Sequence, residues 1–253
     1  MFTIERLLRL KKYPLDEAMG ELRRIQTFSK DEYLAWQENK KWELVKFHFQ
    51  HNPFYKKMVG NYLPESWEDL PIIHKKDLQK SPDLLLSNGL QKRELHFGST
   101  SGSSGIPLKF ARDKFSHSIT WALILDRYSK VGISSSDLQA RFFGIPLGKS
   151  AYYKERVKDY MMNRYRFVIF DISDSALDGF IHKFRTTPFK YLYGYTNSQL
   201  TFARHLKSKG LTLKELCPTV SACIVTSEQC TQEDKAFLEK VFQIDLTCHT
   251  DRR

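Results

Sequence analysis

A segment rich in glycine and hydroxyl side chains contains the residues of this 253-residue sequence that are best suited to chemistry. It reads Ser99-Thr100-Ser101-Gly102-Ser103-Ser104-Gly105 and lies between two short β-type runs, Leu95–Phe97 and Pro107–Ala111. Glycines let a chain turn its N–H groups inward and hydroxyls add donors, so the segment predicts a concave site for phosphate oxygens. It lacks the Gly-Lys-Ser/Thr of a Walker A loop and the spacing of the dinucleotide-binding fingerprint. Composition alone also fits a flexible surface loop.

The order of residues resembles a known phosphate loop. Thr100-Ser101-Gly102-Ser103-Ser104-Gly105-Ile106-Pro107 is similar to the Thr-Ser-Gly-Ser/Thr-Thr-Gly-x-Pro loop of the adenylate-forming enzymes. Further segments match in the same order and resemble the branch of phenylacetate–coenzyme A ligase and the CapK-type proteins of capsular polysaccharide gene clusters. These segments are His51–Tyr55, Trp67–Ile72, Lys75–Leu78, Tyr193–Ser198 and Val225–Glu228. A combination in order is more specific than any single motif.

The resemblance implies a two-step reaction, in which ATP activates a small-molecule carboxylic acid as an acyl-adenylate and a thiol, usually coenzyme A, then takes the acyl group. It implies ATP and Mg²⁺ as cofactors and coenzyme A as a co-substrate. The resemblance assigns phosphate binding to the segment from Ser99 to Gly105. It assigns the adenine or substrate pocket to Tyr193, Gly194, Tyr195, Thr226, Ser227 and Glu228.

Two departures from the family pattern limit what the resemblance implies. Thr196 stands where the family usually has proline, and the expected Tyr-Gly-x-x-Glu motif is replaced by the residues Leu246–Arg253. We therefore expect a truncated N-terminal domain without the C-terminal lid domain, and we assign no catalytic or metal-binding residue. Little ligase turnover is expected, because the charge of the transition state would not be neutralised. The alternative is a non-catalytic nucleotide-binding or interaction module.

Hydrophobic periodicity divides the chain into a mainly helical region, residues 1–94, and an α/β nucleotide-binding region, residues 95–253, within one structural domain. Helical patterns cover Ile4–Leu10, Leu15–Phe28 and Asp31–Phe49, and later Asp113–Val131, Ser175–Phe184, Ser198–Lys209 and Gln232–Val241. Strand-like runs cover Gln139–Ile145, Arg166–Ile172, Tyr191–Tyr195 and Val220–Thr226. The alternation predicts an α/β fold with a largely parallel sheet. Gly132 and Gly210 are expected as helix C-caps.

The net charge of +11 has a local component, because residues 179–214 contain seven Lys and Arg side chains and no acid. Such a stretch favours anionic partners, including nucleotide phosphates and coenzyme A. Nucleic-acid binding is a third interpretation that charge alone supports, since no reading motif accompanies it. The cations are Lys183, Arg185, Lys190, Arg204, Lys207, Lys209 and Lys214.

Other candidate residues favour structural roles. His96 could orient a phosphate, but a histidine beside a strand is more often structural. His182 and His205 are expected at the surface, and the acids Asp171, Asp174 and Asp178 are expected to cap a helix or occupy its first turn. No apolar run approaches the roughly 20 residues of a membrane span, and the N-terminus has no signal-peptide pattern. The four cysteines then predict reduced thiols in a cytoplasmic protein.

Overall fold

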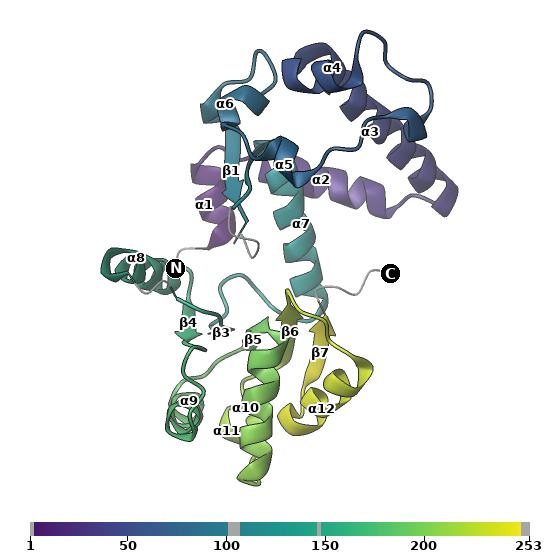
Figure 1. Cartoon of the computed structure of the whole chain (residues 1–253). Helices are drawn as coiled ribbons and strands as arrows, with labels where there is room; N and C mark the ends of the chain where they lie inside the picture. Colours follow the sequence, from purple (N-terminus) through teal and green to yellow (C-terminus); the bar gives the residue numbers. More distant parts are fainter. Residues whose placement is uncertain (1–2, 101–106, 146–147, 249–253) are drawn as a thin grey trace. The chain divides into compact units, whose positions relative to one another are not determined.

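The chain folds as an α/β protein with a helical N-terminal part and a parallel sheet, as predicted (Figure 1). The structure is a computed structural model that describes residues 3–100, 107–145 and 148–248. Contacts divide the chain into two compact units, one made of Leu8–Leu123 and the other of Ile124–Arg253 together with Met1–Leu7. The domain boundary expected at residues 94 and 95 stays a prediction. None of the described helices is long and apolar enough to cross a membrane.

The unit made of Leu8–Leu123 combines helices with one two-stranded antiparallel sheet, β1 (Leu95–Ser99) with β2 (Lys109–Asp113). Its buried apolar side chains include Leu8, Leu15, Val45 and Leu95. Helices α1 (Ile4–Leu10) and α7 (Lys114–Lys130) each cross the division between the units. The remaining helical elements are α2 (Leu15–Gln26), α3 (Lys30–His51), α4 (Pro53–Val59), η1 (Trp67–Asp69), α5 (Lys75–Leu78), α6 (Pro82–Leu85) and η2 (Lys92–Glu94).

Buried Asn52 explains the segment His51–Tyr55 in structural terms. Helix α3 ends at His51, because the residue before a proline disfavours helical dihedrals. The Asn52 side chain accepts a hydrogen bond from the backbone N–H of Tyr55 at 3.0 Å and so caps α4. Its amide also donates to the carbonyl of Leu85 at 2.8 Å. One buried side chain therefore joins two helices to the segment that precedes β1.

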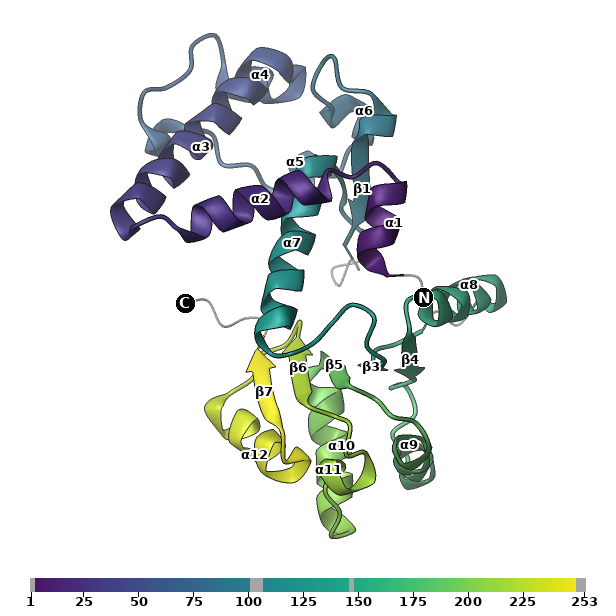
Figure 2. The ribbon, with the colours of Figure 1, turned by 180° about the vertical axis from the view of Figure 1, so that it is seen from behind.

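The other unit contains a five-stranded parallel sheet with the strand order β4-β3-β5-β6-β7 (Figure 2). The chain enters at β3, runs to the edge strand β4, and then crosses back to β5 on the other side of β3. A reversal of this kind defines a topological switch point, here between β3 and β5. The strands are β3 (Gln139–Phe142), β4 (Arg164–Phe167), β5 (Tyr191–Tyr195), β6 (Ala222–Thr226) and β7 (Asp245–Cys248).

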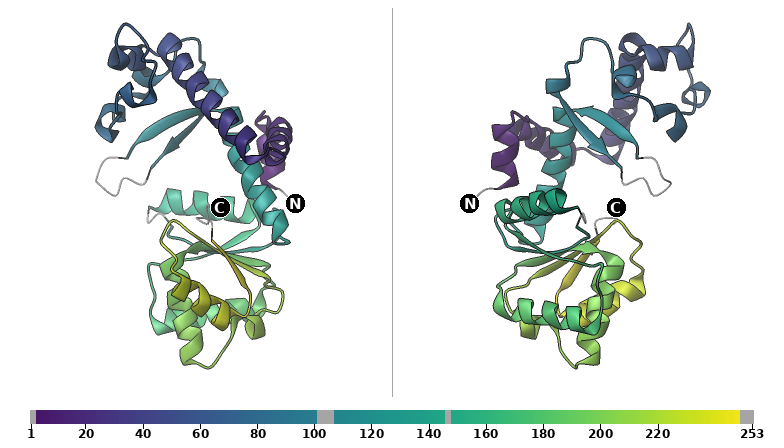
Figure 3. Two further views of the ribbon diagram at one scale, coloured as in Figure 1. Left: turned by 90° about the vertical axis from the view of Figure 1, so that its right-hand side faces the viewer. Right: turned by 60° about the vertical axis from the view of Figure 1, so that its left-hand side comes forward.

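The helices that follow β3 and β5 pack on opposite faces of this sheet (Figure 3). One face carries Phe142, Leu192 and Val225 and forms the main hydrophobic core with four helices. The opposite face carries Arg164 and Arg166, which pair with α8 (Lys149–Met161). The four core helices are α9 (Asp174–Thr186), α10 (Thr196–Ser208), α11 (Leu213–Leu216) and α12 (Gln232–Phe242).

Several local expectations need correction. Helix α8 was not expected, and β4 spans Arg164–Phe167 instead of Arg166–Ile172, because its two arginines are held by Asp159 of α8. His205 is 7% exposed and bonds to Asp178 at 2.8 Å, so its expected surface position is wrong.

The expected glycine C-caps are confirmed. Gly132 and Gly210 have φ values of +68° and +66° directly after α7 and α10.

Gly194 sets how closely β3 and β5 approach each other. A Cβ atom at Gly194 would lie 2.4 Å from the carbonyl oxygen of Phe142 and 2.5 Å from the Phe142 Cβ. Real Cβ atoms do not reach such distances, so any side chain here forces a backbone shift in β3 or β5. The structure gives Gly194 a packing role, and its expected place in a pocket stays a prediction.

We predict that Gly194→Ala destabilises the protein by about 1–3 kcal/mol, because the added methyl overpacks the centre of the sheet. The free energy of unfolding from urea titration measures the effect. Gly179→Ala in α9 is the matched control, since nothing lies within 4 Å of its Cβ position, and it should stabilise the protein by about 0.5–1 kcal/mol. Equal effects of the two substitutions would contradict the packing role.

Candidate functional site

The carboxyl ends of β5 and β6 bring two of the predicted segments together. The strands are parallel neighbours, with Gly194 opposite Val225 and Tyr195 opposite Thr226. Tyr193–Tyr195 and Thr226–Glu228 therefore meet at one edge of the sheet. This edge is adjacent to the switch point between β3 and β5, where open α/β sheets commonly bind ligands.

Glu228 links the loop after β6 to the first turn of α10. Its Oε2 accepts a hydrogen bond from the backbone N–H of Asn197 at 2.7 Å. The hydroxyl of buried Thr196 donates to the carbonyl of Glu228 at 3.5 Å. A carboxylate is favourable at this end of a helix, because it satisfies an unpaired N–H and interacts well with the helix dipole. The Glu228 side chain is thus engaged within the protein.

Ser227 forms the sharp turn between Thr226 and Glu228. Its φ of +67° lies in the left-handed region, which few residues other than glycine adopt. Backbone held in this region concentrates at ligand-binding and active sites. The turn directs the chain from the end of β6 toward α10, where Glu228 is anchored.

Three aromatic rings form a cluster beside the switch point, and we call Phe143, Tyr193 and Tyr195 the aromatic cluster. The ring centroids of Phe143 and Tyr193 are 5.3 Å apart, and those of Phe143 and Tyr195 are 4.6 Å apart. All three side chains are half-buried. The sequence predicted the two tyrosines but missed Phe143, because it lay within an apolar run interpreted as strand interior. The Phe143 ring thus contacts both tyrosine rings next to the strand ends.

The predicted phosphate loop connects β1 and β2. The hairpin is closed by a bond from the Thr100 N–H to the Leu108 carbonyl at 2.9 Å and by one from the Leu108 N–H to the Thr100 hydroxyl at 3.0 Å. The Ser99 hydroxyl donates to the Thr100 carbonyl at 3.2 Å. Ser101, Gly102, Ser103, Ser104 and Gly105 lie outside the described residues. Their phosphate-binding role stays a prediction, as does that of Ser99 and Thr100.

His96 packs against other rings of its own unit. Its ring stacks on His117 with the centroids 3.6 Å apart, and its Nδ1 lies 2.9 Å from the Tyr13 hydroxyl. Trp121 donates to His117 Nε2 at 3.1 Å, and Arg112 Nη2 lies 2.8 Å from His117 Nδ1. If both ring nitrogens of His117 carried a proton, each N–H would face another donor, from Trp121 or from Arg112. Burial, the neighbouring His96 and Arg112 lower the pKa of His117 to about 4.

The basic stretch from residue 179 to 214 meets acids and rings from other elements. Lys209 pairs with Asp178 at 2.8 Å, and Lys183 lies 4.6 Å from the centre of the Tyr165 ring. Lys214 donates to the carbonyl of Val220 at 2.7 Å. Arg204 and Lys207 line a groove of about 580 Å³ that also contains Glu233 and Asp234. A stretch that lacks acids in sequence is therefore partly neutralised in space.

The described His, Cys, Asp and Glu side chains form no large cluster of metal-ligand type. Across residues 3–100, 107–145 and 148–248, no group of three or more His, Cys, Asp or Glu side chains could hold a metal ion.

Comparisons with known proteins identify the fold. Neither the protein-family models nor the curated proteins gave a match. The solved structure of 2-hydroxyisobutyryl-CoA ligase in an open conformation, in complex with 2-HIB-AMP and CoA, is similar with a TM-score of 0.58 and 16% identity over 89% of this chain and 55% of the ligase chain. Its postadenylation state with R3-HIB-AMP gives a TM-score of 0.58 and 16% identity over 89% of this chain and 50% of that chain. This chain thus spans about half the length of these ligase chains and shares their fold.

We predict that Glu228→Ala lowers the free energy of unfolding by about 0.5–2 kcal/mol, because the first turn of α10 loses an acceptor. Glu228→Gln keeps an acceptor oxygen without the charge and should lose less. Urea unfolding of the three proteins measures the difference. Equal stability of wild type and Glu228→Ala would show that the contact with Asn197 contributes nothing.

We predict that the stability contributed by His117 is present above pH 6.5 and is lost as the pH falls toward about 4, because its pKa is lowered from 6.5 in the folded state. Protons bind the unfolded imidazole first and so favour unfolding in this interval. Urea unfolding between pH 8 and pH 4 tests this with His117→Gln, which should lose stability less steeply than wild type. His182→Gln, on the exposed side of α9, controls for removing an imidazole. Parallel pH profiles of wild type and His117→Gln would refute the prediction.

Proposed function

We propose that this chain binds ATP and a small carboxylic acid as the nucleotide-binding part of an adenylate-forming acid–thiol ligase. The carboxylate of the acid attacks the α-phosphate of ATP, pyrophosphate leaves and an acyl-adenylate forms. A thiol, coenzyme A in this proposal, then attacks the activated carbonyl and AMP leaves. The observation that carries the proposal is the switch point, where Tyr193–Tyr195 and the turn at Ser227 meet beside a half-buried aromatic cluster.

The shared fold supports this choice among the ligand classes that a switch point can serve. The similar ligase structures contain acyl-adenylates, and one of them also contains CoA. In this proposal the segment Ser99–Gly105 holds the ATP phosphates. Thr226, Ser227 and the backbone of Glu228 line the adenine side, and Tyr193 and Tyr195 line the acid side.

A finer assignment follows from the sequence segments His51–Tyr55, Trp67–Ile72 and Lys75–Leu78. These segments support the branch of phenylacetate–coenzyme A ligase and the CapK-type proteins. We propose that the chain acts in surface polysaccharide synthesis in the cytoplasm, and that the small carboxylic acid it activates is specific to this role.

Nucleotide binding tests the proposal, with ATP and AMP compared by isothermal titration calorimetry. Ser103→Ala together with Ser104→Ala should weaken ATP binding at least tenfold and leave AMP binding within twofold, because AMP lacks the β- and γ-phosphates that the loop would hold. Ser150→Ala, at an exposed position of α8, is the control and should change neither affinity.

Two results would contradict this assignment. A wild-type chain that binds neither nucleotide at millimolar concentration refutes the proposed function. Loss of AMP and ATP affinity to the same degree in the double variant refutes the assignment of the loop to the outer phosphates. Carboxylate-dependent ATP–pyrophosphate exchange then separates a ligase from a module that only binds nucleotide.

A further inference from the structure

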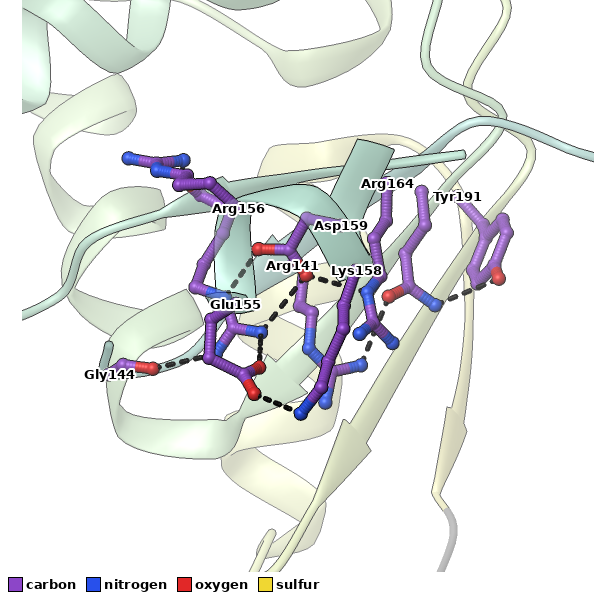
Figure 4. Close-up of polar contacts among 10 residues, drawn as sticks. Arg141, Gly144, Glu155, Arg156, Lys158, Asp159, Arg164 and Tyr191 are labelled. Carbon is purple, nitrogen blue, oxygen red and sulfur yellow. Dashed lines mark hydrogen bonds and ion pairs between the residues drawn. The ribbon is translucent and has the colours of Figure 1, made fainter. Parts of the chain in front are cut away.

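Arg141 is a cation near the centre of the parallel sheet. It belongs to β3, opposite Arg166 of β4 on one side and Tyr193 of β5 on the other. Figure 4 shows its side chain on the face of the sheet that α8 covers. The side chain is half-buried, and its Nε is shielded from solvent without a hydrogen-bond partner among the described residues.

The groups that contact Arg141 are neutral. Its Nη1 donates to Gln139 Oε1 at 3.2 Å, and the Gln139 amide in turn donates to the hydroxyl of Tyr191 at 2.8 Å. The guanidinium carbon lies 4.2 Å from the centre of the Phe143 ring and 5.3 Å from that of Tyr193. Two members of the aromatic cluster thus lie against the guanidinium without balancing its charge.

The nearby carboxylates form ion pairs with other cations (Figure 4). Asp159 binds Arg164 Nε at 2.6 Å and Arg166 Nε at 2.8 Å. Glu155 binds Arg166 at 3.0 Å and also pairs with Lys158. Within the described part of the chain, Arg141 therefore forms no ion pair. Burial, Arg164 and Arg166 together lower the pKa of Arg141 to about 10, which still leaves it charged at neutral pH.

A charge that is partly withdrawn from water is normally paired, because the loss of hydration is costly unless a counter-charge compensates. The unpaired guanidinium of Arg141 has three possible roles: it packs the sheet, it binds a nucleotide phosphate, or it binds a second oxyanion on the acid substrate. Packing alone would be served better by an apolar side chain of the same length. The phosphates already have a predicted loop, and the carboxylate that is to be activated must stay free to attack. The aromatic cluster beside Arg141 further favours a planar apolar acid.

We propose that Arg141 binds a second anionic group of the acid substrate, so that the preferred acid is a planar dianion such as an aromatic dicarboxylate. This inference rests on the proposed function and specifies its acid. Arg141 would select the substrate by pairing with the oxyanion that does not react, while Phe143 and Tyr193 contact the planar framework. A monoanionic acid of the same shape would leave the guanidinium unpaired.

Binding of terephthalate and benzoate to the full chain tests the proposal without nucleotide. Wild type should bind terephthalate at least tenfold more tightly than benzoate, and Arg141→Gln should bind the two within about twofold. AMP affinity should be the same in both proteins. Absence of a dianion preference in wild type, or its persistence in Arg141→Gln, overturns the proposal.

The source of the oxyanion is tested separately. If Arg141→Gln loses affinity for AMP or inorganic phosphate instead, the oxyanion belongs to the nucleotide and the proposed acid is wrong. A wild-type chain that binds no AMP but shows Arg141-dependent dianion binding refutes the proposed function and leaves the oxyanion site standing.

The thermal stability of the unliganded chain provides a second test of the proposed role of Arg141. Arg141→Met removes an uncompensated charge and should raise Tm by about 2–4 °C. Arg166→Met, which removes the partner of Asp159 and Glu155, should lower Tm and is the matched control. A fall in Tm for Arg141→Met comparable to that for Arg166→Met assigns Arg141 a packing role and overturns the proposal.

Discussion

The close approach of β3 and β5 at Gly194 is the constraint on which the candidate site depends. With no side chain at this position, Phe142 packs directly against β5 and the two strands pair along their length. The helices that follow these strands leave toward opposite faces, and this reversal makes the strand ends a topological switch point. Arg141 and the aromatic cluster lie on these two strands or directly after them.

The elements with clear alternation or clear boundaries could be predicted from the sequence. Strand β5 was expected at Tyr191–Tyr195 and lies there, and α1 was expected at Ile4–Leu10 and lies there. The approach of Tyr195 to Thr226 then follows from the general rule that parallel strands end at the same edge. The pattern of hydrophobic residues is sufficient to predict an element when burial of its apolar side chains alone decides its structure.

The elements that ion pairs hold in place could not be predicted in the same way. Helix α8 has no clear apolar stripe, since its inward side carries Glu155 and Asp159, and β4 begins with the arginines that these acids bind. Charge pairing across elements has no period in the sequence. For the same reason the sequence did not single out Arg141, which forms no ion pair within the described residues, or Glu228, whose partner is a backbone N–H 31 residues away.

The contact between Glu228 and Asn197 also decides where an external anion can bind. The N-terminus of a helix is a natural anion site, and in α10 the chain places its own carboxylate there. Because Glu228 is tethered, it competes at an effective concentration that short linkers bring to the millimolar range. A free phosphate near Thr196 would have to displace this internal ligand. The first turn of α10 therefore already holds an anion of the protein itself, and an external phosphate would meet free N–H donors more readily elsewhere.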